Sequence, residues 1–222
     1  MASKSVRAPR DSVNKFQRRT IEIVVGDDQR VYGVYEGLVR SSSPFFDKAL
    51  AGEWKESAQR TVQLPNDEPK KVALYIHWLY YGTLPVFCDE PGAIENSEYL
   101  DLAKAYTLGD KILDTLFQDT VIDAIIEKSR SAARDGHRWY PGRAVLDYAY
   151  QNIAESAQIL ELFVDMYVTK GNTSWLQEWT DPTHIPQPFL LSVASKLLDR
   201  RAVSKEPLEA LIYHIHGRNH DK

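Results

Sequence analysis

Short β-prone runs and helical stretches follow one another in the first third of the chain. Apolar side chains recur at every second position over residues 20–26, and a second β-prone run covers 30–34. A period of two is that of a half-buried strand, and the polar turn at 26–29 suits an antiparallel connection. The pattern therefore predicts a hairpin of two strands, followed by a third short strand over 61–64.

Helical spacing begins after the hairpin. Ser43 and Pro44 are typical of a helix start, because serine can cap the first turn and proline suits the first helical position. Gly52 is expected to end that helix. Pro69 begins the next predicted helix, which ends near Gly82. The apolar stripe expected on this helix consists of Val72, Ile76, Leu79 and Tyr80.

The rest of the chain is predicted to be helical. Ser97 is expected to cap a helix that breaks at Gly109-Asp110 and continues to Arg130. After a loop near residues 135–142, the remaining predicted helices cover 143–153, 158–169, 187–200 and 206–216.

This order predicts an α+β fold followed by an all-helical extension. The expected parts are a flexible basic tail (1–18), a mixed domain (19–130) and a helical extension (131–222). The linker between the last two parts is short, so they can share one continuous core.

Composition narrows the class of protein. Hydrophobic residues make up 43% and charged residues 26%, as in ordinary globular proteins, and the net charge of -4 does not favour binding to nucleic acid. Cys88 is the single cysteine, so no internal disulfide is expected. No apolar run approaches the roughly 20 residues of a membrane span, and the N-terminus lacks the apolar core of a secretory signal. A cytoplasmic and/or nuclear location is expected.

Candidate catalytic chemistry is sparse. His214, His216 and His220 are spaced so that the first two point to different faces of a helix, which makes a shared metal site poor and a solvated helix end the better interpretation. No glycine-rich phosphate loop or nucleophile elbow is present. We expect no catalytic, cofactor-binding or metal-binding residues, and hence no enzyme and no cofactor.

The order of signals resembles the BTB/POZ domain over about residues 20–128. The matching pieces are an aromatic-x-Val motif, a leucine turn, Ser-x-x-Phe and a helix ending in Tyr-x-Gly, found here at Tyr32 and Val34, Leu38 and Val39, Ser43 to Phe46, and Trp78 to Gly82. Two positions depart from the family, because Thr20 and Tyr35 stand where it usually has aspartate and histidine.

A second resemblance extends the match to about residue 176. Filamentous-fungal proteins of this family carry a helical tail with a Tyr-x-Tyr-x-Asn-Thr type helix, a leucine-rich segment ending in Val-Asp, and Trp-Leu. Similar pieces occur here at Tyr148 to Asn152, Leu162 to Asp165, and Trp175-Leu176. The chain is therefore similar to the fungal type with a C-terminal helical extension.

The resemblance implies a protein–protein interaction module without chemistry of its own. Trp54 and Glu56 resemble the hydrophobic-x-Glu motif with which many BTB adaptors bind a cullin scaffold of ubiquitin ligases, and the docking surface is expected to include Tyr99 and Tyr106. A large apolar side chain that fills a pocket beside an orienting carboxylate suits a tight interface. Alternatively, Trp54 packs locally within its own domain.

Two functional hypotheses follow. The first is a substrate adaptor for a cullin-type ligase, and the alternative is a self-associating scaffold or transcription-regulatory interaction domain without cullin binding. Both have other proteins as partners and allow a homodimer. Neither involves a membrane or direct binding to nucleic acid.

Overall fold

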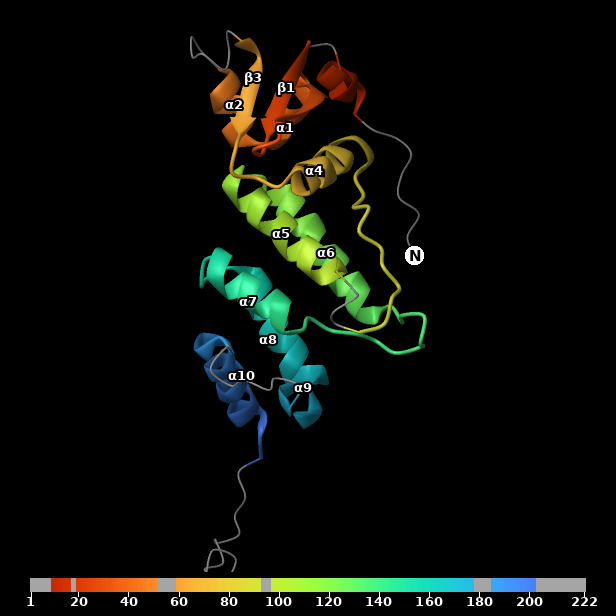
Figure 1. Cartoon of the computed structure of the whole chain (residues 1–222), viewed down its shortest axis with the longest axis vertical. Helices are drawn as coiled ribbons and strands as arrows, with labels where there is room; N and C mark the ends of the chain where they lie inside the picture. The colour runs from red at the N-terminus through yellow and green to blue at the C-terminus, as the bar shows by residue number, and fades with distance from the viewer. Residues whose placement is uncertain (1–8, 17–18, 52–58, 93–96, 178–184, 203–222) are drawn as a thin grey trace, which may run out of the picture.

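A computed structural model describes residues 9–16, 19–51, 59–92, 97–177 and 185–202 of the chain. A small sheet with its helices forms one end of the molecule, two long helices lie in the middle, and further helices form the other end (Figure 1). The predicted α+β class with an all-helical continuation is confirmed. In the described part, no helix is long and apolar enough to cross a bilayer.

The sheet has three strands, β1 (Thr20–Val25), β2 (Arg30–Tyr35) and β3 (Thr61–Leu64), in the order β2-β1-β3. β1 pairs antiparallel with β2 and parallel with β3. The alternating apolar side chains of the central strand are buried, so the predicted hairpin and third strand are confirmed.

Helices α1 (Glu36–Ser42) and α2 (Pro44–Leu50) follow the hairpin. The backbone N–H of Phe46 donates to the Ser43 hydroxyl over 3.3 Å, which confirms the predicted helix start. α1 was expected to be a turn, and that expectation is wrong because seven residues there are helical. α2 ends at Leu50, and Gly52 lies outside the described residues.

Helix α4 (Pro69–Tyr81) begins at the predicted proline and ends at Gly82, whose positive φ of 67° allows the left-handed cap. The predicted apolar stripe is confirmed in part, because Val72 is buried and Ile76 and Leu79 pack half-buried against the core. The buried residues are Val72, Leu74 and Tyr75, whereas Tyr80 is exposed. The helix packs against α1, β2 and α5. Its buried face therefore includes Leu74 and Tyr75, which the predicted stripe left out.

The two central helices are α5 (Glu98–Lys111) and α6 (Thr115–Arg130). The predicted break at Gly109 is wrong, because α5 continues through it and the chain turns at Leu113, where φ is 58°. Ser97 stands at the expected start of α5, but its side chain makes no capping bond to the backbone. Its hydroxyl instead donates to Asp101 over 3.2 Å.

The C-terminal helices in the described part are α7 (Arg143–Asn152), α8 (Gln158–Lys170), α9 (Thr173–Gln177) and α10 (Gln187–Arg200). α5 packs against α7, and α8 packs against α10, so one hydrophobic core runs through both halves. The helix predicted over 206–216 lies outside the described residues, as do residues 1–8 and 17–18 of the tail predicted over 1–18. Within that tail, Arg10–Phe16 form the 3-10 helix η1, so this part of the chain is ordered and not a flexible tail. A division into domains at residue 130 stays a prediction.

Candidate interaction surface

Aromatic rings, three of them exposed and that of Tyr35 half-buried, meet where three elements converge: η1 (Arg10–Phe16), the end of β2 and the last turn of α4. The ring centroids of Phe16 and Tyr35 are 5.6 Å apart, those of Tyr35 and Tyr80 are 6.3 Å apart, and those of Tyr80 and Tyr81 are 6.5 Å apart. We call these four residues the aromatic strip. Tyr81 is 72% exposed. Aromatic side chains of this kind supply rigid apolar contact area to a partner.

A groove of about 520 Å³ adjoins the strip, between η1, α1, α4 and α6. Its apolar surface comes from Leu38, Trp78 and Leu79, and Lys15 also lines it. The Trp78 indole N–H donates to the Thr120 hydroxyl over 3.0 Å, which ties α4 to α6. We call this hollow the α4–α6 groove.

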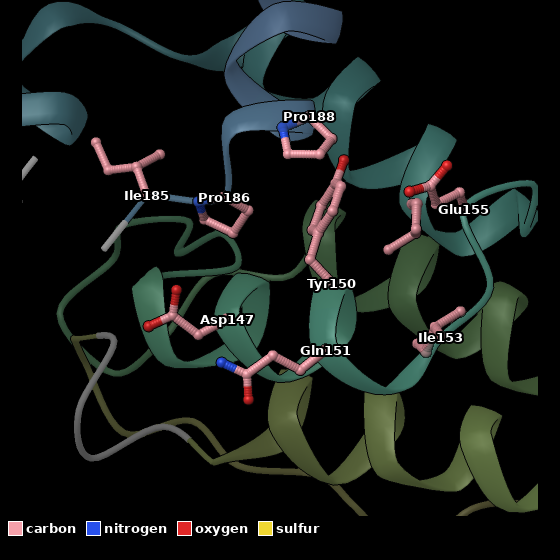
Figure 2. A pocket seen from close by; sticks show the side chains of 9 residues that line it. Asp147, Tyr150, Gln151, Ile153, Glu155, Ile185, Pro186 and Pro188 are labelled. Carbon is pink, nitrogen blue, oxygen red and sulfur yellow. The ribbon is translucent and has the colours of Figure 1, made fainter. Parts of the chain in front are cut away.

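A second hollow, of about 370 Å³, lies between the end of α7 and the start of α10 (Figure 2). The Tyr150 ring and two prolines, Pro186 and Pro188, supply apolar surface, while Asp147 and Glu155 carry negative charge. Among the described residues that line it there is no cation. Tyr150 and Gln151 add hydrogen-bond donors beside these two carboxylates.

The four predicted partner-binding residues are not brought together in the described part of the chain. Trp54 and Glu56 lie outside the described residues. Tyr99 and Tyr106 lie on α5 with exposures of 3% and 8%, and burial raises the pKa of both hydroxyls. The Tyr99 hydroxyl donates to the carbonyl of Trp139 over 3.1 Å. Both rings belong to the core, so a partner at α5 would meet the neighbouring exposed side chains, and docking there stays a prediction.

A buried ion pair was not foreseen. The Lys128 ammonium lies 3.0 Å from the Glu98 carboxylate, with side-chain exposures of only 6% and 7%. Lys128 also donates to the carbonyl of Cys88 over 2.5 Å, and the N–H of Cys88 donates to Glu98 over 2.9 Å. The pair thus holds the loop that follows α4 against both central helices, and this loop exposes Phe87.

A second buried polar centre surrounds Asp114. Its carboxylate accepts from the N–H of Phe117 over 3.0 Å, which caps α6, and from the Tyr75 hydroxyl over 2.9 Å. The Ser42 hydroxyl also donates to it. Burial, and then the charge of Asp114, raise the pKa of Tyr75. The Asp114 carboxylate therefore connects α1, α4 and α6. Its capping role could have been predicted from the sequence, because aspartate is a typical residue directly before the start of a helix.

Metal-binding side chains do not cluster in the described part of the chain, where no group of three or more His, Cys, Asp or Glu could hold an ion. His214, His216 and His220 lie outside it. Cys88 is partly buried. The features that are present are surfaces and buried ties between helices.

Comparison with known proteins gives only distant structural likenesses. No family model matches the chain, and no curated protein matches it. Among solved structures, the BTB (Tramtrack and Bric a brac) domain of human gigaxonin is similar, with a TM-score of 0.38 and 11% sequence identity over 56% of this chain and 98% of that chain. A likeness this distant says nothing about function, which has to be argued from the residues.

Proposed function

We propose that this protein is a protein–protein interaction module and, more specifically, a BTB/POZ-type substrate adaptor for a cullin-type ubiquitin ligase, of the kind found in filamentous fungi. The aromatic strip carries the interaction role. Phe16, Tyr80 and Tyr81 are exposed, and each leaves apolar ring surface in water that a partner would bury. We further propose a cytoplasmic and/or nuclear location, where a single cysteine stays reduced.

The cullin role rests on Trp54 and Glu56. They stand in the stretch between α2 and β3, the place at which the resembling family carries its hydrophobic-x-Glu motif. A tryptophan that enters an apolar pocket contributes most of the affinity of such a contact, and a neighbouring carboxylate fixes its orientation. Clients would be held by other surfaces of this chain.

The test is the affinity for a cullin N-terminal domain from the same organism, measured by titration calorimetry. We expect Trp54→Ala/Glu56→Ala to weaken binding by at least about tenfold. The matched control is Phe87→Ala/Glu127→Ala, which removes an exposed ring and an exposed carboxylate elsewhere and should keep wild-type affinity. Equal affinities of the wild type and the Trp54/Glu56 variant would exclude the docking assignment, and no binding by folded wild type would exclude the adaptor role.

A self-associating scaffold is the second candidate, and the sheet edge favours it. In the described part of the chain, β2 pairs on one side only, with β1, and its Val31 side chain is exposed. An unpaired edge can receive a strand from a second copy. Under this alternative the mass of the purified chain rises with concentration in the absence of cullin, and Val31→Lys reverses that rise.

A further inference from the structure

The α4–α6 groove combines an apolar surface with two exposed carboxylates. Leu116 on α6 is 65% exposed at the groove. Asp119 and Asp123 follow on the same helix, one turn apart and both exposed. Within the described part of the chain, neither carboxylate makes an ion pair or a hydrogen bond. Like charges four residues apart on a helix repel each other, so a cation placed between them would be stabilised.

The chain shows elsewhere how such a pair is used. On α8, Glu161 and Asp165 have the same four-residue spacing, and Lys196 of the packed helix α10 lies between them. The Lys196 ammonium is 2.9 Å from Asp165 and also contacts Glu161, and these hydrogen bonds raise its pKa. There, a carboxylate pair on one helix receives a cation from a second helix that packs beside it.

We propose that the α4–α6 groove is a docking site for a helical segment of a partner protein. The segment presents one bulky apolar side chain to Trp78, Leu79 and Leu116, and a lysine or arginine to Asp119 and Asp123. This inference rests on the proposed function, because it names a surface with which an interaction module would hold a client.

Charge complementarity selects this occupant. An anionic membrane or a nucleic acid would be repelled by Asp119 and Asp123. Lys15, which also lines the groove, limits the cationic positions of the segment to the α6 side and favours an acidic or neutral residue facing η1. The aromatic strip continues the same surface, since Lys15 precedes Phe16 on η1 and Leu79 precedes Tyr80 on α4. A segment that leaves the groove can therefore extend over exposed rings.

The test is a selection of random displayed peptides on the folded full-length chain, followed by anisotropy titration of the enriched peptides. We expect binders to carry a bulky apolar residue and a lysine or arginine within one helical turn. Asp119→Asn/Asp123→Asn and Leu116→Ser should each weaken these peptides by about tenfold or more. The matched control Asp27→Asn/Asp28→Asn removes the same charge from the exposed turn between β1 and β2 and should bind like the wild type.

Several results would overturn the proposal. These are a selection that enriches no peptide, binders without the cationic and apolar pair, and binders that the groove variants retain at full affinity. A self-associated chain that Asp119→Asn/Asp123→Asn dissociates would assign the groove to a second copy instead. Peptide binding that appears only after residues 1–8 are removed would assign it to the chain's own N-terminal segment.

The peptide-binding test and the cullin-binding test can fail independently of each other. The Trp54→Ala/Glu56→Ala variant should bind the selected peptides with wild-type affinity, because peptide binding is assigned to Leu116, Asp119 and Asp123 and cullin binding to Trp54 and Glu56. Peptide binding without cullin binding would contradict only the adaptor role. Cullin binding without peptide binding would contradict only the groove.

Discussion

Lys128 lies 3.0 Å from Glu98 inside the protein, and both side chains are almost fully buried. The residues come from the end of α6 and the start of α5, and the backbone of Cys88 bonds to both. A buried charge is tolerated only when it is paired and hydrogen-bonded. This pair therefore fixes the path of the loop after α4 relative to the two central helices.

Removing one charge of this pair should destabilise the fold and loosen the loop. In Glu98→Gln, the ammonium of Lys128 stays buried without its anion, and we expect a loss of about 3 kcal/mol in the free energy of unfolding, measured with urea. The single thiol, Cys88, should react faster with a thiol reagent under native conditions. Glu127→Gln, an exposed neighbour on α6, is the control and should change neither quantity. Wild-type stability and thiol reactivity in Glu98→Gln would show that the pair does not hold the loop.

Asp114 should be among the most sensitive positions of the mixed domain. Asp114→Ala removes the cap of α6 and leaves the Tyr75 hydroxyl buried without its acceptor. We expect a loss of about 3 kcal/mol. Tyr75→Phe removes one of these bonds and leaves the cap, so it should cost less, about 1 kcal/mol. Urea unfolding of both variants checks the order, and a larger loss in Tyr75→Phe would contradict it.

Gly109 allows α6 to approach α5. A Cβ at this position would lie 2.7 Å from the Cγ of Gln118 and 3.1 Å from the ring of Phe117. Alanine favours a helix over glycine by about 1 kcal/mol, but overpacking a buried contact costs about 1–3 kcal/mol. We therefore expect Gly109→Ala to lower the thermal midpoint. Gly33→Ala is the control, because a Cβ there meets nothing within 4 Å. A thermal midpoint that falls in Gly33→Ala but not in Gly109→Ala would contradict the packing role of Gly109.

Glu36 should make stability depend on pH. Burial opposes its charged form, but hydrogen bonds from Arg40 and Arg60 outweigh burial and lower its pKa below the ordinary value of 4.5. A lowered folded-state pKa adds stability that is fully present above the unfolded-state pKa and is lost as the pH falls through the folded-state pKa. The stability difference between wild type and Glu36→Gln should therefore be largest near neutral pH and shrink below pH 4.5. Urea midpoints across the acid range measure it, and a difference independent of pH would contradict the ion pair.

Local signals in the sequence sufficed for the elements with a clear period or a specific start. The hairpin, the strand over 61–64 and the starts at Ser43 and Pro69 are found where periodicity, capping and proline place them. The helix break predicted at Gly109 is wrong because glycine allows close packing between two helices there and does not end the helix. On α4, apolar residues occur nearly all around the helix, so spacing alone could not choose the buried face.

The candidate surface was less accessible to sequence reasoning. Glu98 and Lys128 are thirty positions apart, and no local pattern relates them. Tyr99 and Tyr106 were expected at the docking surface because the resembling family docks at this helix, but α5 lies in the middle of the molecule and is covered by α4, α6 and α7. The α4–α6 groove depends on four elements that only the tertiary fold brings together.

We propose that this chain is an adaptor that holds a cullin. Light scattering with size-exclusion chromatography tests it most directly, on the purified chain alone and mixed with a cullin N-terminal domain. We predict a complex whose mass is the sum of the two components, absent when Trp54→Ala/Glu56→Ala replaces the wild type. Wild-type chain that elutes at its own unchanged mass in the presence of the cullin domain would contradict the claim.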